Sequence, residues 1–556
     1  MRKATLSIPG LALVLLALAP VASLAQEPKT FRTSWKTIDA ESSLATNDNV
    51  LELRLDEAIA VALQRNLGLR IQRFQRSRAL FTVLQNRGIY DYNLTGDGLI
   101  RDSTTPAASQ LDGADVRLSE TQSLNLGLDR LIPTGGVAGL SFTNQRFESN
   151  SVFAQINPSF DVGIEAVFSQ PLLRGRGRLA TERNLRIAGL DAEIALEDLE
   201  RAVSDTIELV ESAYWSLVES RAQLEVARES LGLAEELHEM NKVQVDVGTK
   251  APLELIQSEV GIATRQEDII RLEADVEDAA DSLRELLNLD GPRFWDAQIV
   301  PATDPEQARL EIDLDRALAT ANQERPEVRA ARKRIEQLAL DSRFFRNQRL
   351  PRLGLEVRYG YSGLGGDVAV TEGSIFDPDP VVTIVPGGYD DALDQVIDRD
   401  FDAWQVALNF AMPLQNRAAR AQSTIADLAL EQGETQLEQT LLQVQTDVRR
   451  AARGVRTAAQ QIDSARISRE LAERNLDAEE KRYENGITTS FQVLEIQEDL
   501  SQARSREVNA ITAYRRALTA FYKATGQLLE EAGVEIEDDT DLETLEPTEQ
   551  QSASQP

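Results

Sequence analysis

Apolar positions recur at alternating steps of three and four residues in two long stretches of the chain, about 210–289 and 448–528. The second stretch repeats the first at an offset of 238 residues, so that Val448 corresponds to Val210. A seven-residue period of this kind gives a helix an apolar seam that packs against another helix. Because each stretch is interrupted once and the two correspond along their length, the sequence predicts two broken helical hairpins in a duplicated chain.

Glycine marks the interruption in each hairpin. The first lies at 247–252 and contains Gly248 and Pro252, and the second lies at 485–490 and contains Gly486. A glycine can adopt positive φ and end a helix, and proline suits the first turn of the next one. We therefore expect tight turns at these two positions, each between a rising and a descending helix.

Strand-like alternation occurs at matching points of the two repeats. A helix at 55–87 with a break at 66–68, and its counterpart at 314–347 with a break at 325–326, precede these strands. The predicted strands are, in chain order, 89–94, 160–168, 352–359 and 404–410. One apolar and one polar face suit the wall of a membrane barrel. An ordinary half-buried sheet is the alternative.

The two repeats differ in the segment that connects their first predicted strand to their second. The first contains an additional hairpin within 121–147, with strands at 123–131 and 137–147 joined by 132–136, and the second contains a Gly-, Pro- and Asp-rich connector at 362–400. The sequence leaves open whether the additional hairpin widens the wall or folds over its mouth.

Composition excludes several classes of function. The 556 residues carry 59 Lys and Arg against 91 Asp and Glu, a formal net charge of −32, which argues against nucleic acid as a partner. The chain has no cysteine and a single histidine, His238, which corresponds to Leu476 and is expected at the edge of a seam. We find no catalytic set, no metal site and no cofactor motif. The basic run 174–178 lacks the spacing of a phosphate loop and is interpreted as a rim near lipid phosphates.

The chain divides into consecutive segments. A charged start, a short apolar run and small residues before Gln26 indicate a secretory signal peptide. The expected segments are a signal peptide at 1–25, an N-terminal arm at 26–50, a first repeat at 51–290, a bridge at 291–311, a second repeat at 312–529 and an acidic, disordered tail at 530–556.

Several motifs resemble those of the TolC-like outer-membrane efflux proteins, from about residue 50 to 529. They are Val247-Gly248-Thr249 with Leu253-Glu254-Leu255, Tyr483-Glu484-Asn485-Gly486 with Val493-Leu494-Glu495, Ser169 to Gly175, and Tyr514 to Leu528. The resemblance implies a mainly α protein with a β-barrel part. It also implies a homotrimer, in which two strands per repeat would give a twelve-stranded barrel in outer-membrane lipid above an α-helical periplasmic tunnel.

The resemblance also implies site residues. A periplasmic adaptor linked to an inner-membrane transporter is expected to dock at the hairpin tips, which comprise Val247, Gly248, Thr249, Asn485, Gly486 and Ile487. The periplasmic entrance is expected to be narrowed at Gln492 and Glu495, although the family pattern has an acid at the first position. In the family, side-chain contacts that hold the entrance closed involve the positions of Glu254, Tyr483 and Thr488. The family pattern has an arginine at the position of Thr488, so the contact expected to remain here is a hydrogen bond from Tyr483 to Glu254.

The function implied is a passive exit duct of a tripartite efflux or type I secretion system. The alternative is a coiled-coil spacer in the periplasm or at the cell surface, which would explain the seams but not the paired strands. Extraction would separate the two, since a duct requires detergent. The cargo is not encoded in any feature of the sequence.

Overall fold

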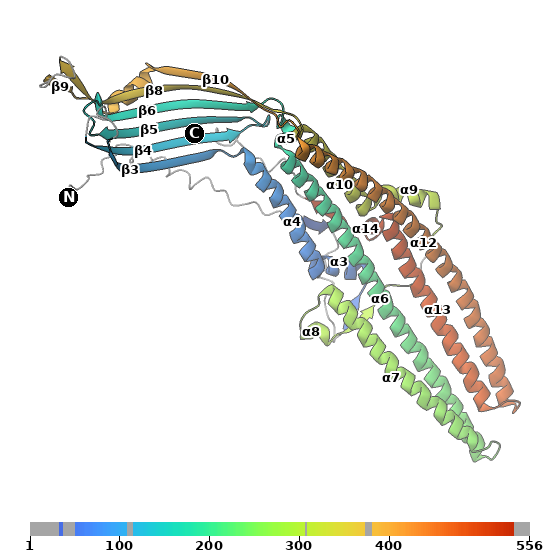
Figure 1. Cartoon of the computed structure of the whole chain (residues 1–556). Helices are drawn as coiled ribbons and strands as arrows, with labels where there is room; N and C mark the ends of the chain where they lie inside the picture. Colours follow the sequence, from blue (N-terminus) through green and yellow to red (C-terminus); the bar gives the residue numbers. More distant parts are fainter. Residues whose placement is uncertain (1–32, 37–49, 108–114, 306–308, 373–380, 539–556) are drawn as a thin grey trace, which may run out of the picture. The chain divides into compact units, whose positions relative to one another are not determined.

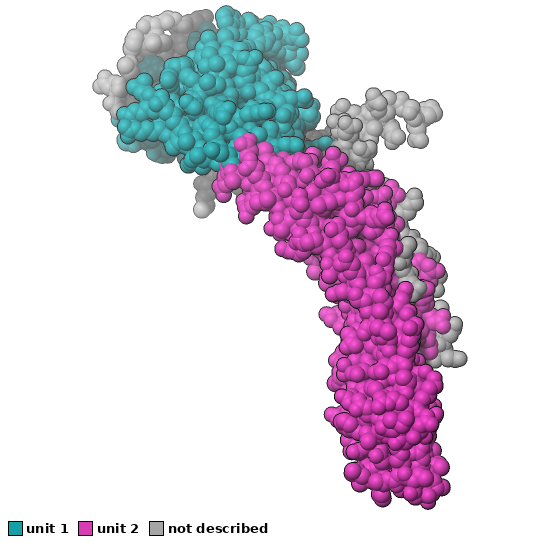
Figure 2. Space-filling view, turned by 90° about the vertical axis from the view of Figure 1, so that its right-hand side faces the viewer, with its two compact units in different colours: residues 1–30, 81–189, 336–431 teal, residues 31–80, 190–335, 432–556 magenta. Residues whose placement is uncertain are grey.

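The computed structural model describes residues 33–36, 50–107, 115–305, 309–372 and 381–538. Their contacts divide the chain into two compact units, which Figure 2 colours teal and magenta. The first unit contains the described parts of 81–189 and 336–431, and the second contains those of 31–80, 190–335 and 432–556. The predicted signal peptide lies outside the described residues.

The first unit contains a seven-stranded antiparallel sheet (Figure 1). Its main path has the order β10-β8-β6-β5-β4-β3, and β9 pairs with β8 beside this path. The strands are β3 (Asn93–Pro106), β4 (Val116–Leu131), β5 (Val137–Ser149), β6 (Ile156–Pro171), β8 (Arg352–Glu372), β9 (Val381–Val385) and β10 (Asp402–Ala411). The strands predicted at 160–168, 352–359 and 404–410 are confirmed, and β8 runs well beyond its predicted end. The strand predicted at 89–94 is wrong for residues 89–92, where a 3-10 turn precedes β3.

The additional hairpin of the first repeat, β4 and β5, belongs to the sheet and separates β3 from β6. One chain therefore supplies six strands to the main path. The count of two strands per repeat that underlies the predicted twelve is wrong for this sheet. Alternation in the sequence identified the hairpin, but alternation determines only which face a side chain occupies and not which strand lies next to it.

Two neighbouring rows of side chains, on opposite faces of the sheet, differ in polarity across the six strands of the main path. One row, read across the sheet through the printed register, is Leu94, Leu128, Leu140, Ala166, Tyr359 and Trp404. The neighbouring row on the opposite face is Thr95, Gly127, Ser141, Glu165, Gly360 and Ala403. Many side chains of the apolar face are exposed within the chain, Trp404 by 73%. Such a surface suits contact with lipid on one side and water on the other.

A short helix, α11 (Tyr389–Asp398), covers part of the apolar face. Its Ala392 and Val396 form a buried cluster with Val162 of β6. The close approach requires glycine at Gly363, because a Cβ there would lie 1.9 Å from the carbonyl oxygen of Ala392. The connector at 362–400 is therefore more regular than the sequence indicated, since it contains the end of β8, β9 and this helix.

Long helices form the predicted hairpins, α6 (Arg183–Asp246) with α7 (Leu253–Leu287) and α12 (Arg417–Glu484) with α13 (Ser490–Thr525). The other helices of the first repeat are α3 (Leu55–Arg65), α4 (Leu67–Arg87) and α5 (Arg178–Thr181), and those of the second are α9 (Leu314–Glu324) and α10 (Pro326–Gln348). The expected breaks in all four places are confirmed. At about 1.5 Å per residue, the 64 residues of α6 span roughly 96 Å.

The predicted seams are the cores of the second unit. Val448 and Val455 of α12 pack with Tyr514 and Phe521 of α13 in one cluster. The equivalent positions of the first repeat lie in a larger cluster with α3, where Tyr214 is fully buried and its hydroxyl donates to the carbonyl oxygen of Leu53 over 3.0 Å. The seven-residue period thus predicted which faces are buried.

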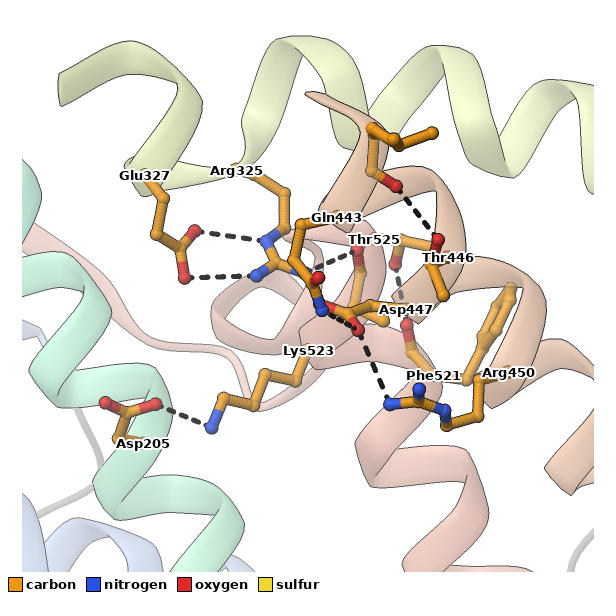
Figure 3. Close-up of polar contacts among 12 residues, drawn as sticks. Asp205, Arg325, Glu327, Gln443, Thr446, Asp447, Arg450, Phe521, Lys523 and Thr525 are labelled. Carbon is orange, nitrogen blue, oxygen red and sulfur yellow. Dashed lines mark hydrogen bonds and ion pairs between the residues drawn. The ribbon is translucent and has the colours of Figure 1, made fainter. Parts of the chain in front are cut away.

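Charged side chains near the end of α13 join helices within the second repeat and also join the two repeats to each other, as Figure 3 shows. Arg325 donates two hydrogen bonds to Glu327, at 3.0 and 3.1 Å, and lies 3.9 Å from Asp447 of α12. Lys523 of α13 pairs with Asp205 of α6 at 2.6 Å. These pairs are partly buried, so they fix the lateral position of the helices more than pairs at a fully exposed surface would.

Two small sheets were not predicted. The bridge after the first repeat contains α8 (Pro292–Trp295) and β7 (Gln298–Pro301), and β7 pairs in parallel with β2 (Val50–Leu53). Beyond the second repeat, α14 (Leu528–Glu531) leads to β11 (Glu535–Asp538), which pairs with β1 (Thr33–Lys36) of the N-terminal arm. These pairings join segments far apart in the sequence, which local patterns do not reveal. The rest of the predicted tail, 539–556, lies outside the described residues.

Among the residues that the structure describes, none of the helices combines the length and the apolar character needed to cross a bilayer.

Candidate functional site

The tip of the first hairpin is a tight turn between α6 and α7. Gly248 has φ +75°, and its N–H donates to the carbonyl oxygen of Val245 over 2.9 Å. The Thr249 N–H and hydroxyl both donate to the carbonyl oxygen of Gln244, at 2.9 and 2.8 Å. These bonds use carbonyl groups that the end of a helix leaves without partners, so the glycine and threonine together terminate α6.

The second tip repeats this geometry between α12 and α13. Gly486 has φ +70° and donates to the carbonyl oxygen of Tyr483, and Ile487 donates to that of Arg482, both over 2.9 Å. Thr489 caps α13 by accepting from the N–H of Gln492 over 3.4 Å. A side chain at either glycine would meet open space, so positive φ rather than crowding favours glycine here.

Both tips present apolar side chains to solvent. Val247 is 68% exposed and Ile487 66% exposed. Leu253 and Phe491, which occupy equivalent positions in the first turns of α7 and α13, are similarly exposed. Of the predicted tip residues, Val247 and Ile487 are thus exposed apolar side chains, and Leu253 and Phe491 lie close to them in sequence.

Tyr483 lies beneath the tips and is only 1% exposed. Its hydroxyl donates to Oδ1 of Asn241, which is itself fully buried, and the Nδ2 of Asn241 donates to the carbonyl oxygen of Glu254 over 3.4 Å. The Lys250 ammonium lies 4.1 Å from the centre of the Tyr483 ring. Burial, together with the nearby Glu254 carboxylate, raises the pKa of Tyr483 to about 12.

Glu254 bonds to the start of α13 instead of to Tyr483. Its Oε2 accepts from the N–H of Ser490 over 3.0 Å and also from the Ser490 hydroxyl. The predicted Tyr483–Glu254 hydrogen bond is thus replaced by two connections, one from Tyr483 to Asn241 and one from Ser490 to Glu254. The reason is geometric, since the side chain of Glu254 reaches the N–H groups at the α13 terminus, where a carboxylate is stabilised. We call Asn241, Glu254, Tyr483 and Ser490 the tip network.

The other predicted entrance residues lie at the surface of α13 or just before it. Gln492 and Glu495 are exposed neighbours, and Nε2 of Gln492 donates to Oε2 of Glu495 over 3.0 Å. Thr488 is half-buried. The structure therefore brings Glu254 and Tyr483 to one network and leaves Gln492 and Glu495 facing away from the core of their own chain.

Sequence reasoning missed Asn241, Ser490 and Arg265. Arg265 of α7 is 6% exposed, donates to the Ser230 hydroxyl over 2.9 Å and reaches the carbonyl oxygen of Leu494 over 3.4 Å. Burial lowers its pKa. It lines a cavity of about 370 Å³ between α6, α7 and α13. The sequence did contain a signal for Arg265, because its counterpart in the second repeat is Ala503 and a charged residue is unusual at a position of the apolar seam.

His238 has a structural contact, with Nδ1 lying 2.8 Å from the Ser258 hydroxyl. Within the described part of the chain, no group of histidine and acidic residues is arranged to hold a metal ion.

Comparisons with known proteins agree with this geometry. The family model described as "Outer membrane efflux protein" matches residues 137–289 and 317–527. A curated relative, the pyoverdine export outer membrane protein OpmQ of Pseudomonas putida, is 25% identical over 378 residues, which are 66% of this chain and 70% of that protein.

Solved structures share the fold. The outer membrane channel CmeC of Campylobacter jejuni matches with a TM-score of 0.60 and 15% identity, over 98% of this chain and 95% of that one. The outer membrane protein VceC of Vibrio cholerae matches with a TM-score of 0.58 and 16% identity, over 85% and 96%. The MtrE outer membrane channel of Neisseria gonorrhoeae, solved in its open state, matches with a TM-score of 0.56 and 16% identity, over 90% and 97%.

The tip network leads to a prediction for Tyr483→Phe. Removing the hydroxyl leaves the buried Oδ1 of Asn241 without its donor, so we expect the free energy of unfolding at neutral pH to fall by about 1–3 kcal/mol. Because the folded-state pKa of Tyr483 is raised from 10.0 to about 12, its neutral form stabilises the fold below pH 10, and this contribution is lost as the pH rises through 12. Denaturant unfolding in detergent, followed by circular dichroism at neutral and alkaline pH, measures both effects. Equal stability of the two proteins at neutral pH would contradict the network.

Proposed function

Because the chain belongs to the family of outer membrane efflux proteins, it is an exit channel in the outer membrane of a Gram-negative bacterium, and we propose that three copies assemble into one duct of a tripartite export system. The chain is a transport protein and not an enzyme. The spacer without transport function, considered as the alternative, is therefore set aside.

The trimer rests on one observation, the two open edges of the sheet. Among the described strands, β3 and β10 are the ends of the main path, and each pairs on one side only. Backbone N–H and C=O groups in contact with lipid require partners, so an open edge is not stable in a membrane. Neighbouring copies supply those partners when they close a ring.

An adaptor docks at the tips in this proposal. Support comes from the exposed side chains of Val247, Leu253, Ile487 and Phe491, which present two similar apolar surfaces in each chain. Three chains would present six such surfaces. An adaptor in turn would link the duct to a transporter in the inner membrane, which supplies the energy.

The periplasmic entrance is controlled, we infer, by Glu495 and the tip network. Glu495 is exposed on α13, and three copies around an axis would form an acidic ring that attracts cations. The tip network joins the two hairpins of one chain, because Asn241 and Glu254 belong to the first and Tyr483 and Ser490 to the second. Opening of the entrance would separate these hairpins and break both connections.

Tip docking predicts the effect of Gly486→Pro. Proline cannot adopt φ +70° and lacks the N–H that Gly486 donates to Tyr483, so the tip changes shape while the seams and the sheet are untouched. We expect export in cells to be lost while trimer formation and membrane insertion persist. Gly454→Ala in the middle of α12, where an added Cβ has open space, is the control and should export normally. Unchanged export by Gly486→Pro would count against docking at the tips.

The acidic ring predicts the electrical behaviour of Glu495→Ala. Single-channel currents in planar bilayers should show a weaker preference for cations and weaker block by divalent and trivalent cations than in the wild type. Glu470→Ala removes an exposed acid of α12 and serves as the control, with wild-type block expected. If Glu495→Ala and the wild type share the same selectivity and block, Glu495 does not line the pore.

A further inference from the structure

The additional hairpin is a full part of the sheet. β3 pairs with β4 from Asn93–Asp129 to Pro106–Val116, which is the whole length of β3. β5 pairs with β6 from Val137–Ser169 to Phe147–Ser159. Between the described strands β3 and β6 no register is formed, because the hairpin occupies the position between them. A hairpin folded over the mouth would instead leave β3 beside β6.

The faces of the hairpin match those of the strands around it. On β4, Leu124, Leu126 and Leu128 occupy the apolar face, and on β5 Leu140 and Phe142 lie beside them. The opposite face of the hairpin is polar or small, with Ser123, Asn125 and Gly127 on β4 and Gly139, Ser141 and Thr143 on β5. The hairpin thus has the two-sided character of a membrane wall over the part from Leu124 to Leu128 and from Ala138 to Phe142. Beyond this part the same face is polar, with Glu120, Gln122, Arg146 and Glu148.

We propose that three chains close an eighteen-stranded barrel, with the hairpin as an integral part of its wall. This inference rests on the trimer proposed above. Six strands per chain is an even number, so β3 of one chain and β10 of the next run antiparallel, as the rest of the sheet does. Closure therefore needs no change in the pairing that one chain shows.

The additional strands widen the exit. With neighbouring strands about 4.8 Å apart and tilted by about 40°, eighteen strands have a circumference of about 110 Å, and twelve have about 75 Å. The backbone diameter rises from about 24 Å to about 36 Å, since the diameter of a barrel grows nearly linearly with strand number. A barrel of this diameter encloses more space than side chains can fill, so an aqueous channel remains. Polar side chains such as Ser141 and Thr143 line it.

With the wider barrel, the helical part of the duct limits the size of the solutes that pass. Six hairpins in a trimer contain twelve helices, and at about 8–10 Å between axes these have a circumference of about 100–120 Å. A wall of eighteen strands is as wide as this ring. The barrel is then not the narrowest part of the duct, so solutes too bulky for a twelve-stranded exit pass it, and the entrance near Glu495 limits their size.

A deletion tests the inference directly. Replacing 107–155 by a short turn removes β4 and β5 and leaves β3 and β6 antiparallel at the same end of the sheet, with the hairpins of the tunnel unchanged. Both proteins would be imaged by electron cryomicroscopy in lipid nanodiscs. We expect eighteen strands in the wild type and twelve in the variant, with a barrel about 1.5 times wider in the wild type. A wild-type trimer with twelve strands would overturn the inference but not the proposed function, whereas a wild type that is not trimeric would overturn both.

A second variant covers the case in which the deletion does not fold. The chain lacks cysteine, so Asp97→Cys with Asn125→Cys places a thiol pair between β3 and β4 at registered positions. Oxidation in intact outer membranes should link this pair within one chain, detected by a peptide map. Ser169→Cys with Glu356→Cys, between β6 and β8, is the control for oxidation. A linked control with an unlinked β3–β4 pair would show that the hairpin leaves the wall in the membrane.

Discussion

Unpaired backbone groups along β3 and β10 are the constraint on which the rest of the structure depends. The six-stranded path ends at these strands, and each has one neighbour among the described strands. The apolar face between them, with residues such as Trp404 and Leu408, is exposed in a single chain. Lipid can cover that face but cannot satisfy the N–H and C=O groups of the edges. A single chain therefore forms the sheet but leaves two strand edges without hydrogen-bond partners in the membrane, and further copies supply those partners.

The helical part has a related dependence on neighbours. Each hairpin buries a seam of small and branched side chains, such as Val448 and Val455. Other apolar positions of the same helices, Leu442 and Ile467 among them, remain exposed in one chain. The two hairpins contact each other near their tips, where Leu237 of α6 packs with Leu476 and Val493 of the second repeat. Polar bonds of the tip network lie around this contact, and farther from the tips the ion pairs Arg516–Glu219 and Lys523–Asp205 join the same two hairpins.

Much of this fold could be predicted from periodicity alone, because the repeat makes each pattern occur twice. The breaks at Gly248 and Gly486 and the buried seams follow from local rules on glycine and on apolar spacing. Side-chain partners did not follow. Ser490 bonds to Glu254 across 236 positions of sequence, and its counterpart in the first repeat is Pro252, so the repeat offered no signal. The place of β4 and β5 was likewise beyond local patterns, because strand order depends on which edges are available.

Cross-linking of the two sheet edges tests the central claim that neighbouring chains close the sheet. Double-cysteine variants would combine one lumen-facing position of β3 (Thr95 or Asp97) with one of β10 (Gln405, Ala407 or Asn409), in a chain without other thiols. Ser169→Cys with Glu356→Cys, which links β6 to β8 inside one chain, is the control and should remain monomeric on a denaturing gel. Oxidised membranes should yield covalent trimers in at least one β3–β10 register, and reductant should return them to monomers. Only monomers in every register, with the control pair oxidised, would contradict the account.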